Sequence, residues 1–332
     1  PMNTTNIDLD TIEMTTSQAL QAHGAAAWVA DSVAHAVRMA EGYGNRICGL
    51  YYLESYCAQL RTGRVLGAVE PQVSQPKASS IKVDAKLGFA QPAFARGLPA
   101  ALAAAKLNGI VSLAICHAHT CTSLGYFTEQ IATAGFIAIG LTNATACISP
   151  PGGTKAVLGT NPIAMSVPDQ KTGMAMHFDQ STSAIALGKI TMAAAVGDSI
   201  PIGWGIDADG QPTTDPNAVL QGGSMVSSGG YKGYGFGLMA EILAAAFTNG
   251  NTSGQLEPLK KPDGKPHNLG QTYIIIDPTN VAGAGFWQRL NAIKEAINAQ
   301  PNARLPGANR IPKPIVELDS KVWQQALQLA GP

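Results

Sequence analysis

The sequence is short of charge. Asp, Glu, Lys and Arg make up 13% of its 332 residues, and 22 basic residues balance 22 acidic ones, so the formal net charge is zero. A zero balance without a basic run argues against nucleic acid as the main partner. Because 45% of the residues are apolar, a surface with so little charge suggests that part of it is buried in an oligomer.

Cysteine is also scarce, and its spacing is irregular. The five cysteines are Cys48, Cys57, Cys116, Cys121 and Cys147, and their odd number without a Cys-x-x-Cys pair argues against a disulfide scaffold or a structural zinc site. The first ten residues are polar and lack an apolar signal core, and no apolar run is long enough to cross a bilayer. We therefore expect a protein of the reducing cytoplasm that has no membrane partner.

Common nucleotide and metal motifs are missing as well. No Gly-x-Gly-x-x-Gly follows a first strand, which argues against an ordinary Rossmann domain, and neither a Walker loop nor His-Glu-x-x-His occurs. His117 and His119 could ligate a metal, but no carboxylate or third His lies nearby in the sequence, so we expect no metal. The better interpretation is a polar strand-to-helix turn that receives a cofactor phosphate at the helix N-terminus.

The hydrophobic periodicity alternates between helix and strand and predicts a mixed α/β fold. Residues 256–267 carry Lys, Pro and Gly and are predicted to form an exposed excursion. Helices are expected over 10–38, 50–60, 90–107, 124–134, 182–195, 232–247, 286–298 and 322–329, and strands over 79–84, 110–115, 136–142, 157–167, 174–178 and 273–276.

One stretch, residues 152–164, joins a Gly-rich loop to a Gly-Thr-Asn-Pro turn. Glycines let a backbone come close to a ligand, and Thr and Asn can orient that ligand through hydrogen bonds. Other motifs accompany this turn in a fixed order along the chain: Gly88-Phe89-Ala90-Gln91-Pro92, Gly159-Thr160-Asn161-Pro162, Phe178-Asp179 with Thr182-Ser183, the turn-rich segment 207–216, and Gly229-Gly230-Tyr231-Lys232-Gly233.

Together these motifs resemble the type 2 malate/L-lactate dehydrogenase superfamily, which has a non-Rossmann NAD(P)H fold. Within it the chain looks most like the Δ1-piperideine-2-carboxylate/Δ1-pyrroline-2-carboxylate reductases, which reduce cyclic imino acids with NADPH. The resemblance implies a sheet lobe that binds the cofactor and a helical lobe. It implies an N-terminal helical part, residues 1–75, packed with the C-terminal segment 300–332, a central α/β part, residues 76–299, and a homodimer.

The resemblance also implies where the cofactor, NADPH or NADH, makes contact. The matching residues are His119, Thr120, Cys121, Thr122, Ser123 and Leu124 in the turn, Asp179, Gln180 and Ser181, then Tyr231 and Lys232, and the loop Arg304, Leu305, Pro306, Gly307, Ala308, Asn309 and Arg310. Lys232 could pair with the extra phosphate of NADPH. Thr160, Leu187 and Gly188 match positions that contact a small-molecule substrate.

The chain departs from its family at the proton relay. The family usually carries Ser-His-Gly-x-x-Arg, in which Ser and His donate a proton and Arg grips the substrate carboxylate, and here Ile47, Cys48 and Tyr52 replace them. Where the imine reductases have an aspartate, this chain has Lys189. Tyr43, Cys48 and Tyr52 could donate a proton instead, although Cys48 could equally be a small buried hydrophobe, and Arg46 could hold the carboxylate.

This departure bears on the reaction. A ketone needs a proton on the forming alkoxide, whereas an iminium already carries its proton when hydride attacks carbon, so losing the His favours imine reduction. The leading hypothesis is therefore an NAD(P)H-dependent reductase of a cyclic imino acid. The alternatives are a dehydrogenase of 2-oxo or 2-hydroxy acids, a ketone or imine reductase of a specialised pathway, and a catalytically silent dinucleotide-binding relative.

Overall fold

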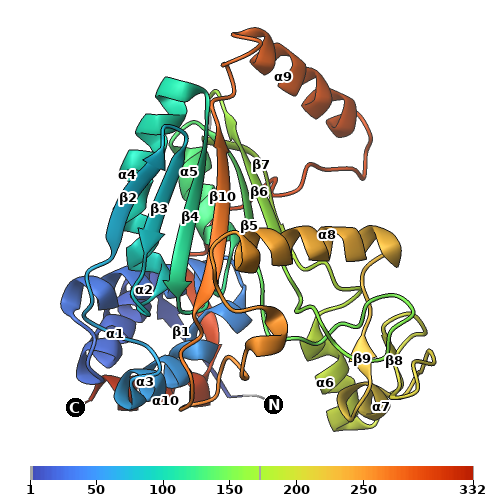
Figure 1. Cartoon of the computed structure of the whole chain (residues 1–332). Coiled ribbons are helices and arrows are strands. Elements are labelled where there is room, and N and C mark those ends of the chain that lie inside the picture. The colour runs from blue at the N-terminus through green and yellow to red at the C-terminus, as the bar shows by residue number, and fades with distance from the viewer. Residues whose placement is uncertain (1–2, 172, 332) are drawn as a thin grey trace.

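The computed structural model describes residues 3–171 and 173–331 and has the predicted mixed α/β fold. A seven-stranded sheet lies at its centre, in the order β2-β3-β4-β10-β5-β6-β7 (Figure 1). β3 and β4 run parallel, and the other neighbouring strands are antiparallel. The strands are β2 (Gln72–Lys77), β3 (Ser80–Asp84), β4 (Ile110–Ala118), β5 (Ile137–Thr142), β6 (Ile163–Asp169), β7 (Gly173–Gln180) and β10 (Leu269–Ile276).

The largest core cluster joins this sheet to two helices, α4 (Ala90–Asn108) and α5 (Gly125–Thr133). Alanine and glycine let α4 lie close to the strands, since a Cβ added at Gly97 would stand 2.4 Å from Val83 Cγ2. Tyr273 of β10 packs at the centre against Phe94 and Phe127, with ring centroids 5.2 and 5.8 Å away. These contacts hold α4 and α5 against the sheet, and the turn after β4 leads into α5.

A second core cluster brings the two ends of the chain together. β1 (Thr4–Asp8) pairs antiparallel with β11 (Ile315–Asp319), and helices α1 (Leu9–Ala22), α2 (Ala27–Gly42), α3 (Leu53–Thr62) and α10 (Ser320–Ala330) pack around them. Leu20 and Val33 share this cluster with Val316 and Trp323. Both ends of the chain lie on this side of the molecule in Figure 1. The domain boundaries drawn from the family resemblance stay a prediction.

A third, smaller cluster lies apart from the sheet around α6 (Leu187–Val196), α7 (Pro216–Leu220), β8 (Gly205–Ile206) and β9 (Ser224–Met225). The helix predicted from residue 182 begins only at Leu187. Hydroxyl groups explain the difference, because Ser181 and Ser183 bond to each other (2.8 Å) and Ser183 donates to Ile185 O (2.8 Å), which holds a non-helical turn.

The strand predicted from residue 157 likewise begins late, at Ile163. Leu158 bonds across to Ile148, outside the sheet, and Asn161 adopts a positive φ of 38°. The sequence patterns do not predict five further strands, which are β1, β2, β8, β9 and β11.

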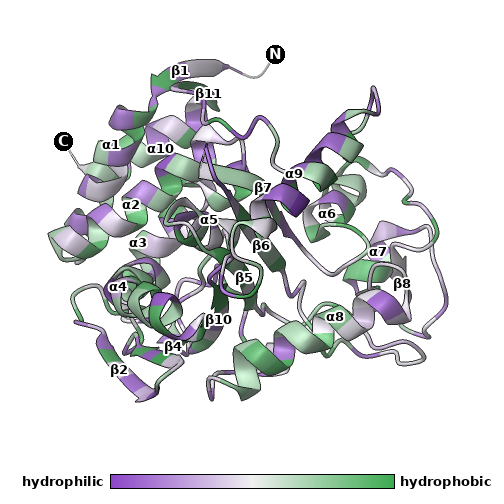
Figure 2. Cartoon of the chain, turned by 90° about the horizontal axis from the view of Figure 1, so that it is seen from above, coloured by the Kyte–Doolittle hydropathy of each residue, from purple (hydrophilic) through white to green (hydrophobic). Residues whose placement is uncertain are grey.

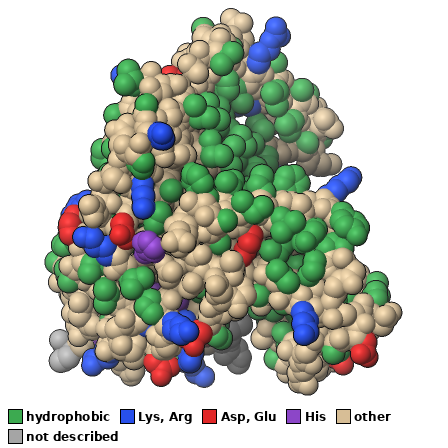
Figure 3. Space-filling view, viewed as in Figure 1, with side chains coloured by type: hydrophobic (Ala, Val, Ile, Leu, Met, Phe, Trp, Pro, Cys, Tyr) green, Lys and Arg blue, Asp and Glu red, His purple; other side chains and the backbone are tan. Residues whose placement is uncertain are grey.

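Two helices keep large apolar side chains at the surface. α8 (Tyr231–Glu241) continues as a π-helical turn, Ile242–Ala246, and its apolar positions Phe236 and Ile242 are more than half exposed. Much of the α8 ribbon has the colour of hydrophobic residues in Figure 2, and Figure 3 shows hydrophobic side chains gathered on the face that carries α8. α9 (Gly285–Asn298) stands away from the sheet in Figure 1, and none of its 14 residues is buried. Among the helices of the described residues, none has the length and apolarity that a membrane span requires.

Candidate active site

The backbone is strained at the end of β4 and in the turn that joins β4 to α5. His117 has a φ of +53° and Thr122 a φ of +59°. A left-handed conformation is a genuine outlier for a β-branched residue, and such outliers gather at functional sites. The Thr122 hydroxyl donates to Cys121 O (2.7 Å) within the turn. The strain therefore supports a functional role for the predicted turn 120–124.

Asp179 at the end of β7 closes the start of α5. Its Oδ2 accepts a hydrogen bond from Gly125 N (2.7 Å), and a Cβ added at Gly125 would stand 2.8 Å from the His177 ring and 2.9 Å from Asp179 Cβ. Surrounding protein desolvates the Asp179 carboxyl and raises its pKa, although the residue keeps exposed surface. The Asp179 carboxyl therefore already accepts the first amide hydrogen of α5. The sequence suggested that a cofactor phosphate would bind at this helix N-terminus.

The C-terminal loop 304–310 crosses β7 beside this point. Pro306 O accepts from His177 N (3.0 Å), and a Cβ added at Gly307 would lie 2.8 Å from His177 O, where φ is +75°. Arg310 pairs with Glu129 on α5 (3.2 Å). Three of the segments predicted to contact the cofactor, 119–124, 179–181 and 304–310, therefore meet where α5 begins.

Tyr43 belongs to the contact that holds this loop. Its hydroxyl donates to Glu129 Oε1 (2.6 Å), and the Arg310 guanidinium lies 3.7 Å from its ring centroid. Burial and the Glu129 carboxylate raise the Tyr43 pKa. Ser123 lines the same small cavity as Tyr43 and Arg310. This geometry favours a structural role for Tyr43, which holds the loop 304–310 beside α5, over the predicted role as a proton donor.

Cys48 and Tyr52 lie in a short segment built around Gly49. Glu41 Oε1 accepts from Leu50 N (2.8 Å), and a Cβ added at Gly49 would overlap the Glu41 carboxyl at 2.2 Å. Burial, with a further contribution from the Asp179 charge, raises the Cys48 pKa to about 12, and burial raises the Tyr52 pKa to about 12. Both groups therefore keep their protons at neutral pH.

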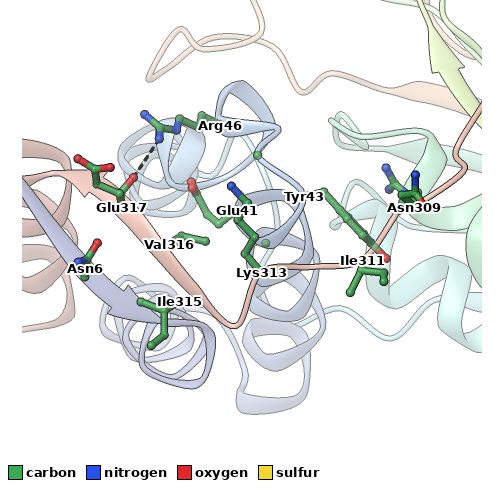
Figure 4. A pocket seen from close by; sticks show the side chains of 13 residues that line it. Asn6, Glu41, Tyr43, Arg46, Asn309, Ile311, Lys313, Ile315, Val316 and Glu317 are labelled. Atoms are coloured by element: carbon green, nitrogen blue, oxygen red, sulfur yellow. Dashed lines mark hydrogen bonds between the residues drawn. The ribbon is translucent and has the colours of Figure 1, made fainter. Parts of the chain in front are cut away.

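Arg46 lines a different cavity, of about 420 Å³ (Figure 4). Its Nη2 donates to Glu317 O of β11 (3.0 Å), and Lys313 lines the same cavity. Tyr43, Asn309 and Arg310 share this cavity with Arg46, whereas Cys48 and Tyr52 are not among its lining residues. Arg46 thus lies in one cavity with the predicted catalytic Tyr43 and with part of the loop 304–310.

A third cavity, of about 430 Å³, lies between the end of β7 and the start of α8. Gln180, Ser181 and Lys232 line it together with Gly229 and the apolar Phe178. Gly229 has a φ of +63°, as does Gly230, and a Cβ added at Gly233 would overlap Ser228 O at 2.0 Å. A cation, hydroxyls and an apolar wall fit a nicotinamide dinucleotide, with phosphate at the polar end and a ring at the apolar end. The Tyr231 side chain is largely exposed.

The predicted substrate positions are only partly brought together. Thr160 O accepts from Thr182 N (2.9 Å), which places it beside Ser181. Leu187 and Gly188 start α6 in the smaller lobe and are not among the lining residues of the three cavities above.

Neither histidine of the 117–119 motif reaches a metal-binding cluster. His117 Nδ1 bonds to Asn268 Oδ1 (2.7 Å), and His119 is buried with Nε2 2.6 Å from Gln59 Oε1. No three His, Cys, Asp or Glu side chains within residues 3–171 and 173–331 lie close enough together to hold a metal ion. His119 is buried as a whole, with 2% of its surface exposed, and its amide N donates to Gly88 O (2.9 Å), so its predicted contact with the cofactor stays a prediction.

The comparisons with known proteins agree with this fold. Over residues 7–314 the chain matches the malate/L-lactate dehydrogenase family. The chain belongs to this family. Its fold is that of the Δ1-piperideine-2-carboxylate reductase of Pseudomonas syringae pathovar tomato, whose crystal structure superimposes with a TM-score of 0.88 at 31% identity, over 98% of this chain and 99% of that one.

Two curated relatives differ in the substrate that their names give. The chain is 39% identical over 290 residues to a Δ1-pyrroline-2-carboxylate/Δ1-piperideine-2-carboxylate reductase of Pseudomonas putida, covering 87% of this chain and 85% of that protein. It is 36% identical over 304 residues to a (2R)-3-sulfolactate dehydrogenase (NADP⁺) of Chromohalobacter salexigens, covering 92% and 90%. The predicted family, fold and oxidoreductase class are therefore confirmed, and they support a nicotinamide cofactor and a small-molecule substrate.

Proposed function

We propose that the chain is an NAD(P)H-dependent reductase of a small cyclic imino acid, of the Δ1-piperideine-2-carboxylate or Δ1-pyrroline-2-carboxylate type. One observation carries this proposal. Cys48 and Tyr52 stand at the predicted catalytic positions, and with pKa values of about 12 they are weak acids at neutral pH. An iminium brings its own proton on nitrogen, so this site suits imine reduction better than ketone reduction.

Bound NAD(P)H supplies the hydride that reduces the imine carbon to the cyclic amine. The chain's part is to hold the cofactor and to orient the substrate. In this proposal the turn 119–124, Asp179–Ser181 and the loop 304–310 hold it near α5, and Lys232 with Tyr231 holds it at the start of α8. We assign NADPH as the preferred form because Lys232 lines a cavity with Gln180 and Ser181, where a cation can pair with an additional phosphate.

The substrate contacts belong to the same proposal. Thr160, Leu187 and Gly188 would contact the substrate, and Arg46 would hold its carboxylate. Replacing Arg46 by Ala tests the last role, because a lost carboxylate contact raises KM for the imino acid. An unchanged KM would remove Arg46 from the site.

A substrate panel tests the function itself. The purified protein is mixed with NADPH or NADH and, in turn, Δ1-piperideine-2-carboxylate, Δ1-pyrroline-2-carboxylate, pyruvate and oxaloacetate, and nicotinamide absorbance is followed. Turnover of the imines supports the proposal. Turnover of the oxo acids alone overturns it, and cofactor binding without turnover on the whole panel favours the silent relative.

A second candidate, a 2-oxo or 2-hydroxy acid dehydrogenase, is favoured by one observation. The Asp179 carboxyl has a raised pKa and lies close enough to Cys48 to raise the pKa of that thiol, so it could supply the proton that a ketone needs. The Chromohalobacter salexigens relative is named for a 2-hydroxy acid substrate. If this candidate is right, Asp179→Asn abolishes oxo-acid turnover, whereas the Kd for NADPH changes much less because Asn can still accept from Gly125 N.

The proposed assembly is a homodimer that covers the apolar side chains of α8 and α9. None of the residues of α9 is buried. The exposed side chains of Phe236, Met239 and Ile242 form an apolar face on α8 and the π-helical turn after it. Light scattering after gel filtration should give twice the chain mass. Phe236→Glu should shift it toward the monomer, whereas Leu107→Glu, at an exposed position at the end of α4, should leave it unchanged.

We also propose a cytoplasmic location. All five cysteines are free, and free thiols persist in a reducing compartment. Cell fractionation with an antibody against the chain tests this, and recovery from an oxidising compartment would contradict it.

A further inference from the structure

Hydrogen bonds attach the segment 256–267 to the rest of the molecule. Gln59 of α3 donates from Nε2 to Leu259 O (2.8 Å) and Lys261 O (2.9 Å). The buried Arg64 donates to Pro258 O (2.9 Å) and Lys261 O (2.6 Å), and its Nε donates to Lys265 O (3.0 Å). Two polar side chains thus hold a predicted exposed excursion in one conformation.

His267, at the end of this segment, links it to the predicted cofactor turn. Its Nδ1 accepts from Thr120 N (3.0 Å), and its Nε2 lies 3.1 Å from Leu259 O. Since a carbonyl only accepts and an amide N–H only donates, the imidazole is neutral with its proton on Nε2. Only 1% of the His267 surface is exposed, and burial followed by the Arg64 charge lowers its pKa to about 3.

His119 completes the arrangement. Its ring stacks on His267 with centroids 4.0 Å apart and planes inclined by 16°. The Gln59 amide nitrogen is already directed at two carbonyls, so its Oε1 accepts from His119 Nε2 (2.6 Å). His119 is neutral as well, and its pKa is lowered by burial. Two neutral rings can stack at this distance without the repulsion that two imidazolium ions would suffer.

We propose that His267 is a positioning residue for the cofactor, which acts by accepting the Thr120 amide hydrogen and so fixing the strained turn 120–124. The His119 ring stacks on the imidazole, and the hydrogen bonds from Gln59 and Arg64 fix the segment that carries it. Both hold the imidazole in place for this bond. The inference rests on the proposed function, in which that turn contacts NAD(P)H. It gives the segment 256–267 a role in the active site although the sequence predicts a surface excursion.

Two substitutions separate the two bonds of the imidazole. In His267→Asn the amide stands near the Nδ1 position and can still accept from Thr120 N, but the bond to Leu259 O is lost. In His267→Gln the longer amide reaches toward Leu259 O, and the Thr120 N–H is left without an acceptor. Each variant loses one hydrogen bond, so their thermal unfolding midpoints should be similar. Asp263→Asn, at the exposed tip of the same segment, is the control for changes in the loop surface.

The decisive measurement is the Kd for NADPH from nicotinamide fluorescence, with hydrogen exchange of the Thr120 amide by mass spectrometry or NMR. We expect His267→Gln to raise Kd at least about fivefold and to speed that exchange, because a buried donor without a partner costs a kcal/mol or more. His267→Asn should restore most of both properties, and Asp263→Asn should match the parent protein.

Equal Kd values for the Asn and Gln variants would overturn the positioning role while leaving the proposed function standing. A parent protein that binds neither NADPH nor NADH would instead overturn the proposed function and the inference with it. If His267→Gln fails to fold, Gln59→Glu is measured in its place, with the same expected rise in Kd. This variant keeps an acceptor for His119 but loses the two hydrogen bonds that Gln59 donates to Leu259 O and Lys261 O.

Discussion

At the residue scale, the Cys48 thiol shows how surroundings decide the chemistry of a position. Its motif alone could indicate a replacement acid or a small buried hydrophobe. Burial and the charge of Asp179 raise its pKa, and Tyr52 and Cys121 are neighbours in the same apolar surroundings, where their own pKa values are raised. A thiol in such surroundings stays protonated and is a poor nucleophile.

This coupling predicts the behaviour of Asp179→Asn. Removing the carboxylate charge lowers the Cys48 pKa, because one of the two effects that raise it is lost, while Asn can still accept from Gly125 N. Since burial is the larger cause, we expect the rate of Cys48 alkylation by iodoacetamide at pH 9 to rise by up to about threefold. Peptide mass spectrometry separates Cys48 from the other four thiols. A slower or unchanged rate at Cys48 would show that Asp179 does not act on it.

Tyr43 gives a second prediction at this scale. If Tyr43 only holds the loop 304–310 beside α5, Tyr43→Phe loses the hydrogen bond to Glu129 and keeps the ring under Arg310. We expect kcat to keep its pH profile and the Kd for NADPH to rise by no more than about fivefold, the value of one partly exposed hydrogen bond. Stopped-flow turnover between pH 6 and 10 measures this. A fall in kcat on the order of 100-fold at saturating NADPH would restore Tyr43 as a proton donor.

At the scale of single elements, α8 offers a matched pair of glycines. A Cβ at Gly233 would lie 2.0 Å from Ser228 O, whereas nothing lies within 4 Å of a Cβ at Gly235. Gly235→Ala should therefore raise the free energy of unfolding by about 0.5–1 kcal/mol through helix propensity. Gly233→Ala should lower it by more than about 1 kcal/mol, because backbone must move at the wall of the Lys232 cavity. Urea unfolding of both variants checks the pair, and equal effects would contradict the packing seen around Gly233.

The elements also show which parts of the fold the sequence could predict. The strands of the sheet core and the long helices follow hydrophobic periodicity, as in β10 and α4. β1 and β11 are short, half-exposed strands whose pairing joins residues more than 300 apart, so no local pattern identifies them. The motif resemblance predicts cofactor contacts at the turn 120–124 and the loop 304–310, and the fold brings these two segments together near the start of α5. His267 and Gln59 could not be found in this way, because only the folded chain brings them to residues 119 and 120.

At the scale of the whole molecule, buried neutral imidazoles set the response to acid. His177 accepts or donates at Nδ1 to Ser166 Oγ (2.8 Å), and burial followed by the Arg310 charge lowers its pKa from 6.5 to about 4. His267 is lowered to about 3. Between pH 6.5 and these values the unfolded chain binds protons that the folded chain does not. The free energy of unfolding therefore falls as pH drops through this window.

We expect each of these imidazoles to contribute a slope on the order of 1 kcal/mol per pH unit between about pH 6 and 4.5, and full stability above pH 7. Glu41 and Asp179 act in the opposite sense, because burial raises the pKa of both carboxyls and the folded chain protonates them first. The slope of one histidine is therefore isolated by comparison with His177→Asn, which keeps a partner for Ser166 but carries no titrating group. Urea midpoints at pH 7.5, 6.0 and 5.0 should converge for parent and variant as pH falls. Parallel curves would mean that His177 binds protons equally in the folded and unfolded chains, which contradicts a pKa lowered by burial.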